Sequence, residues 1–483
     1  MRAAERRERA GLWFAALAIG SAAALAPGCS DEDQSSPTTA TATSDGGGGT
    51  TGTGSAQGGY AGGGGGAGAE AGGGAGAEGG AGGAAGGLSV SIEQITDHHR
   101  YAPGQMFGGW GPHLGHLVRA QASSGGGESL WFVDDYCSQA AGLGQCDVLH
   151  DHTLGYFERT ATGWQSRGTA TIPGQVQQNT ATIASASGDT LLSYGVDVSG
   201  LVLRECSYAI ASSTTTCTAL PFSLPGNSNY IGAAISPTGA KVVWWTRVQD
   251  GGGGDFYYVV DYGGGWNGPR SGTAAGYNDA SYINIAFGAG ATQNLFTMHV
   301  QLVSGWAPNW EFHGAVGYGD LTTTDPVTWA DVLTPPSGDT IASTNDVWID
   351  PGTGDTHLVA RSGGGAAVCY HRTAAGVWSG PQLSLAATYR ARFVYSADRL
   401  VLLYGPNSGD LAYRIAPAAA RVAGAPIDWA ALPEVPIALP TGYGAVIAIY
   451  PESPAYQTTP AQGIHAVVVG QTEQNVATHV AIE

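Results

Sequence analysis

Residues 180–197 read TATIASASGDTLLSYGVD, an apolar run, a turn containing Gly188, and a second apolar run. Short apolar or alternating runs separated by turn residues are typical of paired β-strands. The same arrangement returns from Tyr230 as YIGAAISPTGAKVVWWTR and from Tyr282 as YINIAFGAGATQNLFTMHV. No long stretch of helical periodicity interrupts these runs, so the sequence predicts an all-β protein.

This strand–turn–strand pattern occurs seven times between residues 88 and 483. The copies begin at Leu114, Thr180, Tyr230, Tyr282, Asp346, Tyr389 and Tyr443. A period of roughly 40–50 residues or slightly more, with four strands in each unit, is the signature of a β-propeller. Tryptophans after outer turns support the repeat, at Gly163-Trp164, Gly265-Trp266, Val377-Trp378 and Asp428-Trp429. We predict a seven-bladed propeller over residues 88–483, with six or eight blades as alternatives.

The two ends of the domain are expected to meet in one blade. The last unit has a single outer strand, Ala477 to Glu483, and an early strand, Ser89 to Ile95, is available to complete it. Such closure would remove the exposed sheet edges that an open array leaves.

Residues 1–29 have the pattern of a secretory signal. Four arginines within the first nine residues precede an apolar run over residues 12–26, which is shorter than the roughly 20 residues of a membrane span. The run ends in LAPGCS, which resembles the bacterial lipoprotein lipobox and marks Cys29 as the lipidated residue. Ordinary cleavage near Ala26 is the alternative. We expect an exported protein of the bacterial cell envelope, lipid-anchored at the outer membrane or cell surface.

Residues 30–87 form a Gly/Ala/Ser/Thr-rich segment. It contains no Val, Ile, Leu, Met, Phe, Trp, Lys or Arg. Such a segment cannot bury enough apolar surface to offset the entropy of ordering it. We predict a disordered linker that separates the folded domain from its anchor.

The remaining cysteines predict disulfides. Cys137 and Cys146 are nine residues apart, and Cys206 and Cys217 are eleven apart, so each pair can close a short loop. Cys369 is expected to remain a buried thiol. Zinc is the competing interpretation, but no C-x-x-C pair is present.

Charge narrows the range of partners. With 19 basic and 38 acidic residues, the formal net charge is −19. A field of this sign repels polyanions, so nucleic acid and anionic membrane surfaces are not expected partners. Any membrane contact is expected through the lipid anchor only.

The repeat rhythm of residues 88–483 resembles the seven-bladed propellers grouped with BNR-repeat and sialidase-like proteins, which include some polysaccharide lyases. The sialidase motif S-x-D-x-G-x-x-W is absent, and its nearest echoes are Ser236-Pro237-Thr238-Gly239 and Asp350-Pro351-Gly352. By analogy with such folds, ligands bind where the innermost strands begin and the second strands end. We call this edge of the sheets the ligand face.

The ligand face is expected to carry polar and aromatic residues from several blades. The candidate ligand-binding residues are Asp135, Asn179, Tyr230, Arg247, Asn345, Arg361, Tyr389 and Arg390. Guanidinium groups bind carboxylates and sulfates through two parallel hydrogen bonds, and aromatic rings stack on sugars. These residue types point to an acidic glycan.

The resemblance to lyases also implies catalytic positions. A histidine would abstract a proton and a tyrosine and an arginine would assist it, which places these roles at His113 or His116, Tyr194 and Arg204. Histidines and acids between residues 98 and 152 could instead form a general acid/base pair or hold a metal such as zinc, and Asp250 and Asp255 could bind calcium. No specific metal motif supports a cofactor.

Two functions therefore remain open. The first is a non-catalytic module that recognises an extracellular glycan or protein. The alternative is a polysaccharide lyase or glycosidase-like enzyme acting on an acidic polysaccharide.

Overall fold

A computed structural model gives the fold of the chain, which divides into two units, residues 1–73 and 74–483. The residues that the structure describes all lie in the second unit. They are 88–97, 115–137, 152–174, 180–197, 200–225, 228–236, 239–248, 254–261, 263–271, 279–287, 295–303, 310–318, 331–333, 341–362, 366–385, 388–396, 399–406, 411–440, 443, 446–452, 463–470 and 476–483. The predicted signal, Cys29 and the linker lie outside these ranges.

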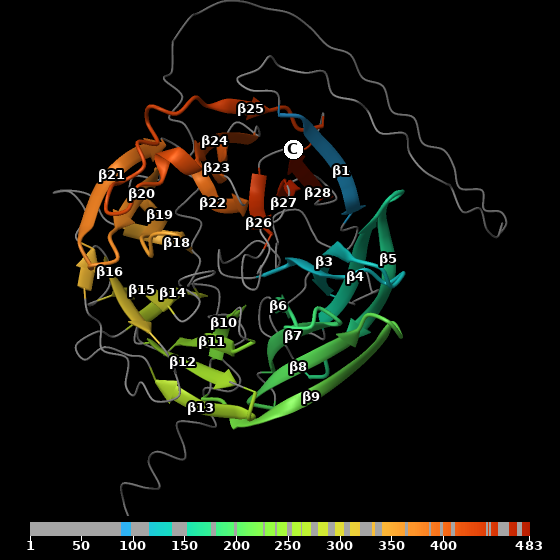
Figure 1. The fold of residues 1–483 in the computed structure, drawn as a ribbon. Helices are drawn as coiled ribbons and strands as arrows, with labels where there is room; N and C mark the ends of the chain where they lie inside the picture. The colour runs from blue at the N-terminus through green and yellow to red at the C-terminus, as the bar shows by residue number, and fades with distance from the viewer. Residues whose placement is uncertain are drawn as a thin grey trace, which may run out of the picture. The chain divides into compact units, whose positions relative to one another are not determined.

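The described strands form seven four-stranded antiparallel sheets, which lie around a central axis in Figure 1. Blades one to three contain β2 (Leu117–Gln121), β3 (Glu128–Cys137), β4 (His152–Thr160), β5 (Gly163–Thr171), β6 (Ala181–Ala184), β7 (Thr190–Asp197), β8 (Val202–Ala209), β9 (Thr214–Ser223), β10 (Ser228–Ile235), β11 (Lys241–Val248), β12 (Gly254–Asp261) and β13 (Trp266–Ser271). Blades four and five contain β14 (Asp279–Phe287), β15 (Leu295–Val303), β16 (Trp310–Tyr318), β17 (Asp331–Leu333), β18 (Ile341–Ile349), β19 (Thr356–Ser362), β20 (Ala367–Arg372) and β21 (Trp378–Leu385). Blades six and seven contain β22 (Thr388–Ser396), β23 (Arg399–Pro406), β24 (Leu411–Pro417), the 3-10 turn η3 (Ala418–Ala420), β25 (Val435–Ile437), β26 (Val446–Pro451), β27 (Ile464–Gly470), β28 (Val476–Ile482) and β1 (Val90–Asp97). The predicted all-β propeller is confirmed.

Blade seven closes the ring with both ends of the domain, as the sequence predicted. Its strand order is β1-β28-β27-β26, so β1 is the outermost strand. Ser89 and Glu483 exchange backbone hydrogen bonds of 2.8 and 3.0 Å beyond the last paired residues. Leu117 of β2 forms a parallel bridge with Glu452, which follows β26. Blades seven and one therefore meet along what we call the closing seam.

Burial changes from the axis to the rim. Every residue of the innermost strand β6 is buried, whereas the outermost strands β5 and β9 are largely exposed or half-buried. Apolar clusters fill the spaces between adjacent blades, and one of them joins Trp131 and Tyr156 of blade one to Tyr208 of blade two. The core is thus a series of seams between sheets, which holds each blade against its neighbours.

One of the predicted outer-strand tryptophans belongs to a loop instead. Trp164, Trp266 and Trp378 lie at the starts of β5, β13 and β21, as the repeat predicted. Trp429 lies in the connection between β24 and β25 and is buried in the apolar cluster of blades five and six. Two prolines, Pro426 and Pro433, lie in this connection. Each lacks the backbone N–H that strand pairing requires.

Candidate functional site

In three blades, backbone pairing brings the start of the first strand beside the end of the second strand. Ser228 at the start of β10 pairs with Arg247 near the end of β11, and Thr388 at the start of β22 pairs with Pro406 at the end of β23. Ile341 of β18 pairs in the same way with Ser362 of β19. The first strand therefore begins where the second ends, as in any antiparallel pair.

Blades one and two carry this edge on the same side. In blades one and two, the Thr182 N–H donates to the Gly115 carbonyl at one end of β2 and β6, and the Gln121 N–H donates to the Gly188 carbonyl at the other. The innermost strands of these two blades therefore run in the same direction. The structure describes the backbone, but not the side chains, of seven predicted site residues: Asp135, Tyr230, Arg247, Asn345, Arg361, Tyr389 and Arg390. His113 and Asn179 lie outside the described residues.

His116 occupies the closing seam. Its side chain is 2% exposed, its Nδ1 lies 2.7 Å from the Val133 carbonyl oxygen, and its ring lies 4.5 Å from that of Tyr450. Packing against blade seven and a hydrogen bond to its own blade thus account for this histidine in the fold.

Tyr194 lies in a different seam, between blades two and three. It is 0% exposed, and its ring meets Trp266 edge to face at 5.9 Å. Burial raises the pKa of Tyr194 well above its ordinary value, and the negative charge of Glu205 raises it further. The phenol therefore keeps its proton at neutral pH.

Arg204 neutralises a buried carboxylate. Its Nη2 lies 2.8 Å and its Nε 3.2 Å from Oδ2 of Asp197, whose side chain is 1% exposed. Asp197 also accepts the backbone N–H of Gly200 at 2.9 Å. His116 and Tyr194 thus belong to separate seams, and Arg204 is paired within its own blade. The catalytic assignment of these residues stays a prediction.

The cysteines are described in part. Cys206 and Cys217, directly opposite each other on β8 and β9, form the predicted disulfide. Cys369 is a buried free thiol as expected, and burial raises its pKa. Of the other predicted pair, Cys146 and the side chain of Cys137 lie outside the described residues.

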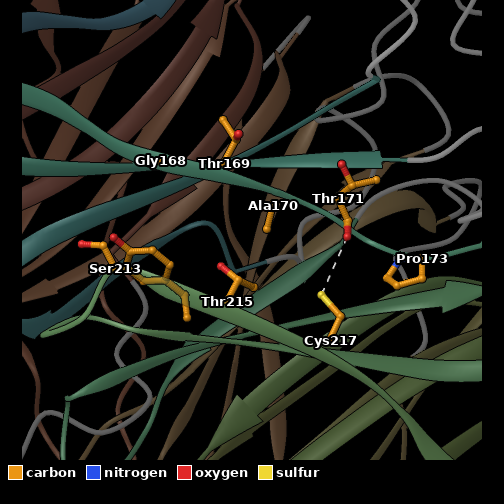
Figure 2. Close-up of a pocket in the computed structure, with 9 residues that line it drawn as sticks. Gly168, Thr169, Ala170, Thr171, Pro173, Ser213, Thr215 and Cys217 are labelled. Atoms are coloured by element: carbon orange, nitrogen blue, oxygen red, sulfur yellow. Dashed lines mark hydrogen bonds between the residues drawn. The ribbon is translucent and has the colours of Figure 1, made fainter.

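A cleft of about 430 Å³ lies between blades one and two (Figure 2). It is lined by Gly168, Thr169, Ala170, Thr171, Pro173, Tyr208, Ser213, Thr215 and Cys217. Figure 2 shows Ala170 pointing from β5 toward β9, and Thr215 and Cys217 pointing from β9 toward β5. We call this the inter-blade cleft.

Both walls of the inter-blade cleft are held in place. The Tyr208 hydroxyl donates to the Arg167 carbonyl at 3.2 Å, a bond that joins blade two to blade one. The ring of Tyr208 stacks on Tyr156 at 4.1 Å. The Cys217 sulfur, which as a disulfide has no proton to donate, lies 3.9 Å from the Thr171 carbonyl oxygen (Figure 2).

The inter-blade cleft was missed by reasoning from sequence. A signal was present, because TAT at 169–171 and STTTCT at 213–218 place several hydroxyl side chains on outer strands. What the sequence did not reveal is that β5 and β9, which are more than 40 residues apart, face each other.

Neither a metal cluster nor a membrane-spanning helix is found in the described ranges. Among them, no group of three or more His, Cys, Asp or Glu residues is arranged to hold a metal ion. No helix within the same residues is long and apolar enough to cross a membrane.

Comparison with solved structures places the fold among propellers of known activity. The chain is similar to the BP39L lectin from Burkholderia pseudomallei, with a TM-score of 0.52, 14% identity, and coverage of 76% of this chain and 96% of the lectin. It is similar to the polysaccharide lyase Uly1, with a TM-score of 0.52, 11% identity, and coverage of 80% and 92%. A PL25 ulvan lyase bound to -[GlcA(1-4)Rha3S]- gives a TM-score of 0.50, 10% identity, and coverage of 80% and 94%.

No protein-family model matches the sequence, and no curated protein has a significantly similar sequence. At the identities of the solved structures, the likeness concerns the fold alone. This chain folds as a β-propeller similar to those of lectins and polysaccharide lyases.

Proposed function

We propose that this protein is an exported, lipid-anchored propeller of the bacterial cell envelope that binds an extracellular glycan at its ligand face. The observation that carries the proposal is the backbone pairing that brings the strand positions of Arg247, Arg361 and Arg390 to the same edge of their sheets. Arginines and tyrosines along one edge suit the carboxylates or sulfates and the sugar rings of an acidic glycan.

Binding is favoured over cleavage by the surroundings of the proposed catalytic groups. His116 and Tyr194 are buried in different seams, and Arg204 neutralises Asp197. A lyase needs its base and its charge-neutralising group within reach of one substrate atom. Lectins and polysaccharide lyases share this fold, so glycan recognition is compatible with the structural similarity. Recognition of a glycan does not need catalysis. A BNR-like or sialidase-like ancestry is part of the same proposal.

The test uses the purified protein with its disulfides intact and a panel of uronate-containing and sulfated polysaccharides. Calorimetry follows binding, and ultraviolet absorbance of an unsaturated uronate follows cleavage. We expect binding without cleavage, and each of Arg247→Ala, Arg361→Ala and Arg390→Ala to weaken binding by about 2 kcal/mol. Binding should also weaken as salt concentration rises.

Arg399→Ala is the matched control, because Arg399 begins β23 at the opposite end of the same hairpin as Arg390. It should bind like the wild type. Cleavage that is lost in His113→Ala, His116→Ala or Tyr194→Phe variants that still fold would establish the lyase function instead. Absence of both binding and cleavage would contradict the acidic-glycan proposal and make a protein the next partner to test.

A further inference from the structure

The inter-blade cleft differs chemically from the ligand face. None of its nine lining residues carries a charge. Ser213 and Thr215 supply hydroxyl groups, Thr171 a backbone carbonyl, and Ala170 and Pro173 apolar surface. We propose that this cleft is a second binding site, for an uncharged sugar unit. The inference rests on the proposed glycan-binding function and adds a site and a ligand class to it.

The size and chemistry of the inter-blade cleft suit a sugar. A volume of about 430 Å³ lies within the range of pockets that hold small ligands. A hydroxyl side chain both donates and accepts hydrogen bonds, as sugar hydroxyls do, and a backbone carbonyl accepts. The methyl of Ala170 and the ring of Pro173 offer contacts for the C–H groups on the face of a sugar ring.

Charge favours a neutral ligand at this site. No lining residue offers a cation to pair with a carboxylate or sulfate. The nearest guanidinium in sequence, that of Arg167, is already bound to Glu158 at 2.7 Å.

The cleft is formed before any ligand arrives. The hydrogen bond from Tyr208 to the Arg167 carbonyl fixes the separation of the two blades, and the Cys206–Cys217 disulfide fixes β9 to β8. At Gly168 the φ angle is +129°, and a side chain there would meet no atom within 4 Å. A site with rigid walls loses little entropy when it binds.

Calorimetric titration with neutral methyl glycosides of hexoses, 6-deoxyhexoses and pentoses tests this site. We expect saturable millimolar binding of at least one glycoside by the purified protein. Thr215→Val, which replaces the hydroxyl with a methyl group of similar size, should weaken it by about tenfold. Thr215→Phe, which fills the cleft, should abolish it.

Thr216→Val and Thr216→Phe are the matched controls. Thr216 is the next residue on β9, is exposed, and does not line the cleft, because successive side chains of a strand point to opposite faces. Both should bind the glycoside like the wild type. Circular dichroism confirms that all four variants are folded.

The outcomes separate this inference from the proposed function. Binding of acidic polysaccharide without any neutral glycoside would overturn the inference and leave the proposed function standing. Glycoside binding that Thr215→Phe does not change would place the sugar elsewhere and would also overturn it. Loss of glycoside binding in Thr215→Phe alone, with acidic-glycan binding unchanged, is the expected result.

Discussion

The closing seam and the inter-blade cleft flank the same blade but are built from different chemistry. At the closing seam, Arg119 binds Glu452 through two hydrogen bonds of 2.7 and 3.0 Å, and Arg159 binds Glu93 at 3.1 Å. At the cleft, uncharged side chains and a disulfide line the space between blades. Blades one and two are joined by a short stretch of chain, whereas blades seven and one meet through the distant ends of the domain. Where two blades are not joined by a short stretch of chain, directional ion pairs can determine which of their residues come into contact.

Arg119→Ala should have the largest effect on stability. It leaves the carboxylate of Glu452, whose side chain is 4% exposed, without its bidentate partner. Removing one partner of a buried ion pair is expected to lower the free energy of unfolding by about 3 kcal/mol. Denaturant unfolding measures the change, and Arg119→Lys should fall between the wild type and the alanine variant. A free energy of unfolding that is unchanged from the wild type would contradict a charged closing seam.

Replacing both Cys206 and Cys217 with alanine should have the next largest effect. The bridge closes a loop with a sequence separation of 11, so its loss is expected to lower the free energy of unfolding by about 2–3 kcal/mol. Because no charge is involved, this loss should not depend on salt concentration, whereas that of Arg119→Ala should shrink as salt rises. If the losses in unfolding free energy of the two variants depended equally on salt concentration, the closing seam and the inter-blade cleft would not differ in the way proposed.

Acid should weaken the closing seam. His479 is 0% exposed, and burial lowers its pKa below 6.5, opposed by Glu93. His479 in turn lowers the pKa of Glu93 below 4.5, opposed by burial and aided by Arg159. A group whose folded pKa is depressed stabilises the fold above its unfolded pKa and loses that stabilisation as pH falls toward the folded value. Stability should therefore decline first below about pH 6.5 and further below about pH 4.5.

The neighbouring His465 strengthens this dependence. Its Nδ1 lies 3.2 Å from Nε2 of His479, so one ring must donate and the other accept, which two protonated rings cannot do. Thermal unfolding between pH 7.5 and 4 measures the effect, and His479→Gln should flatten the slope near pH 6. His357 lies in blade five, and burial lowers its pKa to about 3. The loss of stability that His357 causes as pH falls should therefore remain in His479→Gln. An unchanged slope in His479→Gln would locate the acid sensitivity elsewhere.

Gly168→Ala should have the smallest effect. The added methyl meets no atom, but the φ of +129° disfavours any residue with a Cβ, so a loss of about 1 kcal/mol is expected. Gly115→Ala is the comparison, because its Cβ would lie 2.4 Å from the Thr182 carbonyl oxygen. Thermal unfolding of both should show the larger loss in Gly115→Ala. The reverse order would contradict an open cleft beside Gly168.

The propeller could be predicted because its rule is local. Each repeat pairs two apolar runs across a turn, and this pattern located the first two strands of every blade as well as the closing strand near Ser89. Trp429 did not follow the repeat because it lies in a connection whose prolines cannot donate the backbone hydrogen bonds of a strand. Its burial in the core became visible only in the structure.

The site was harder to predict because it depends on which distant strands meet. The two walls of the inter-blade cleft come from β5 and β9, and the Arg119–Glu452 pair spans the two ends of the ring. His116 and Tyr194 fell at positions that a lyase would use, yet both are buried among aromatic rings. The alternation of a strand predicts which residues share a face, but it does not say which neighbouring blade covers that face.

A sequential titration tests whether this propeller binds glycans at two chemically distinct sites. The protein is first saturated with an acidic polysaccharide from the panel and then titrated with a neutral methyl glycoside, while absorbance reports any unsaturated product. We expect the glycoside to bind with the same affinity with and without the polysaccharide, and no product to form. Competition between the two ligands, release of unsaturated uronate, or failure of both to bind would contradict it.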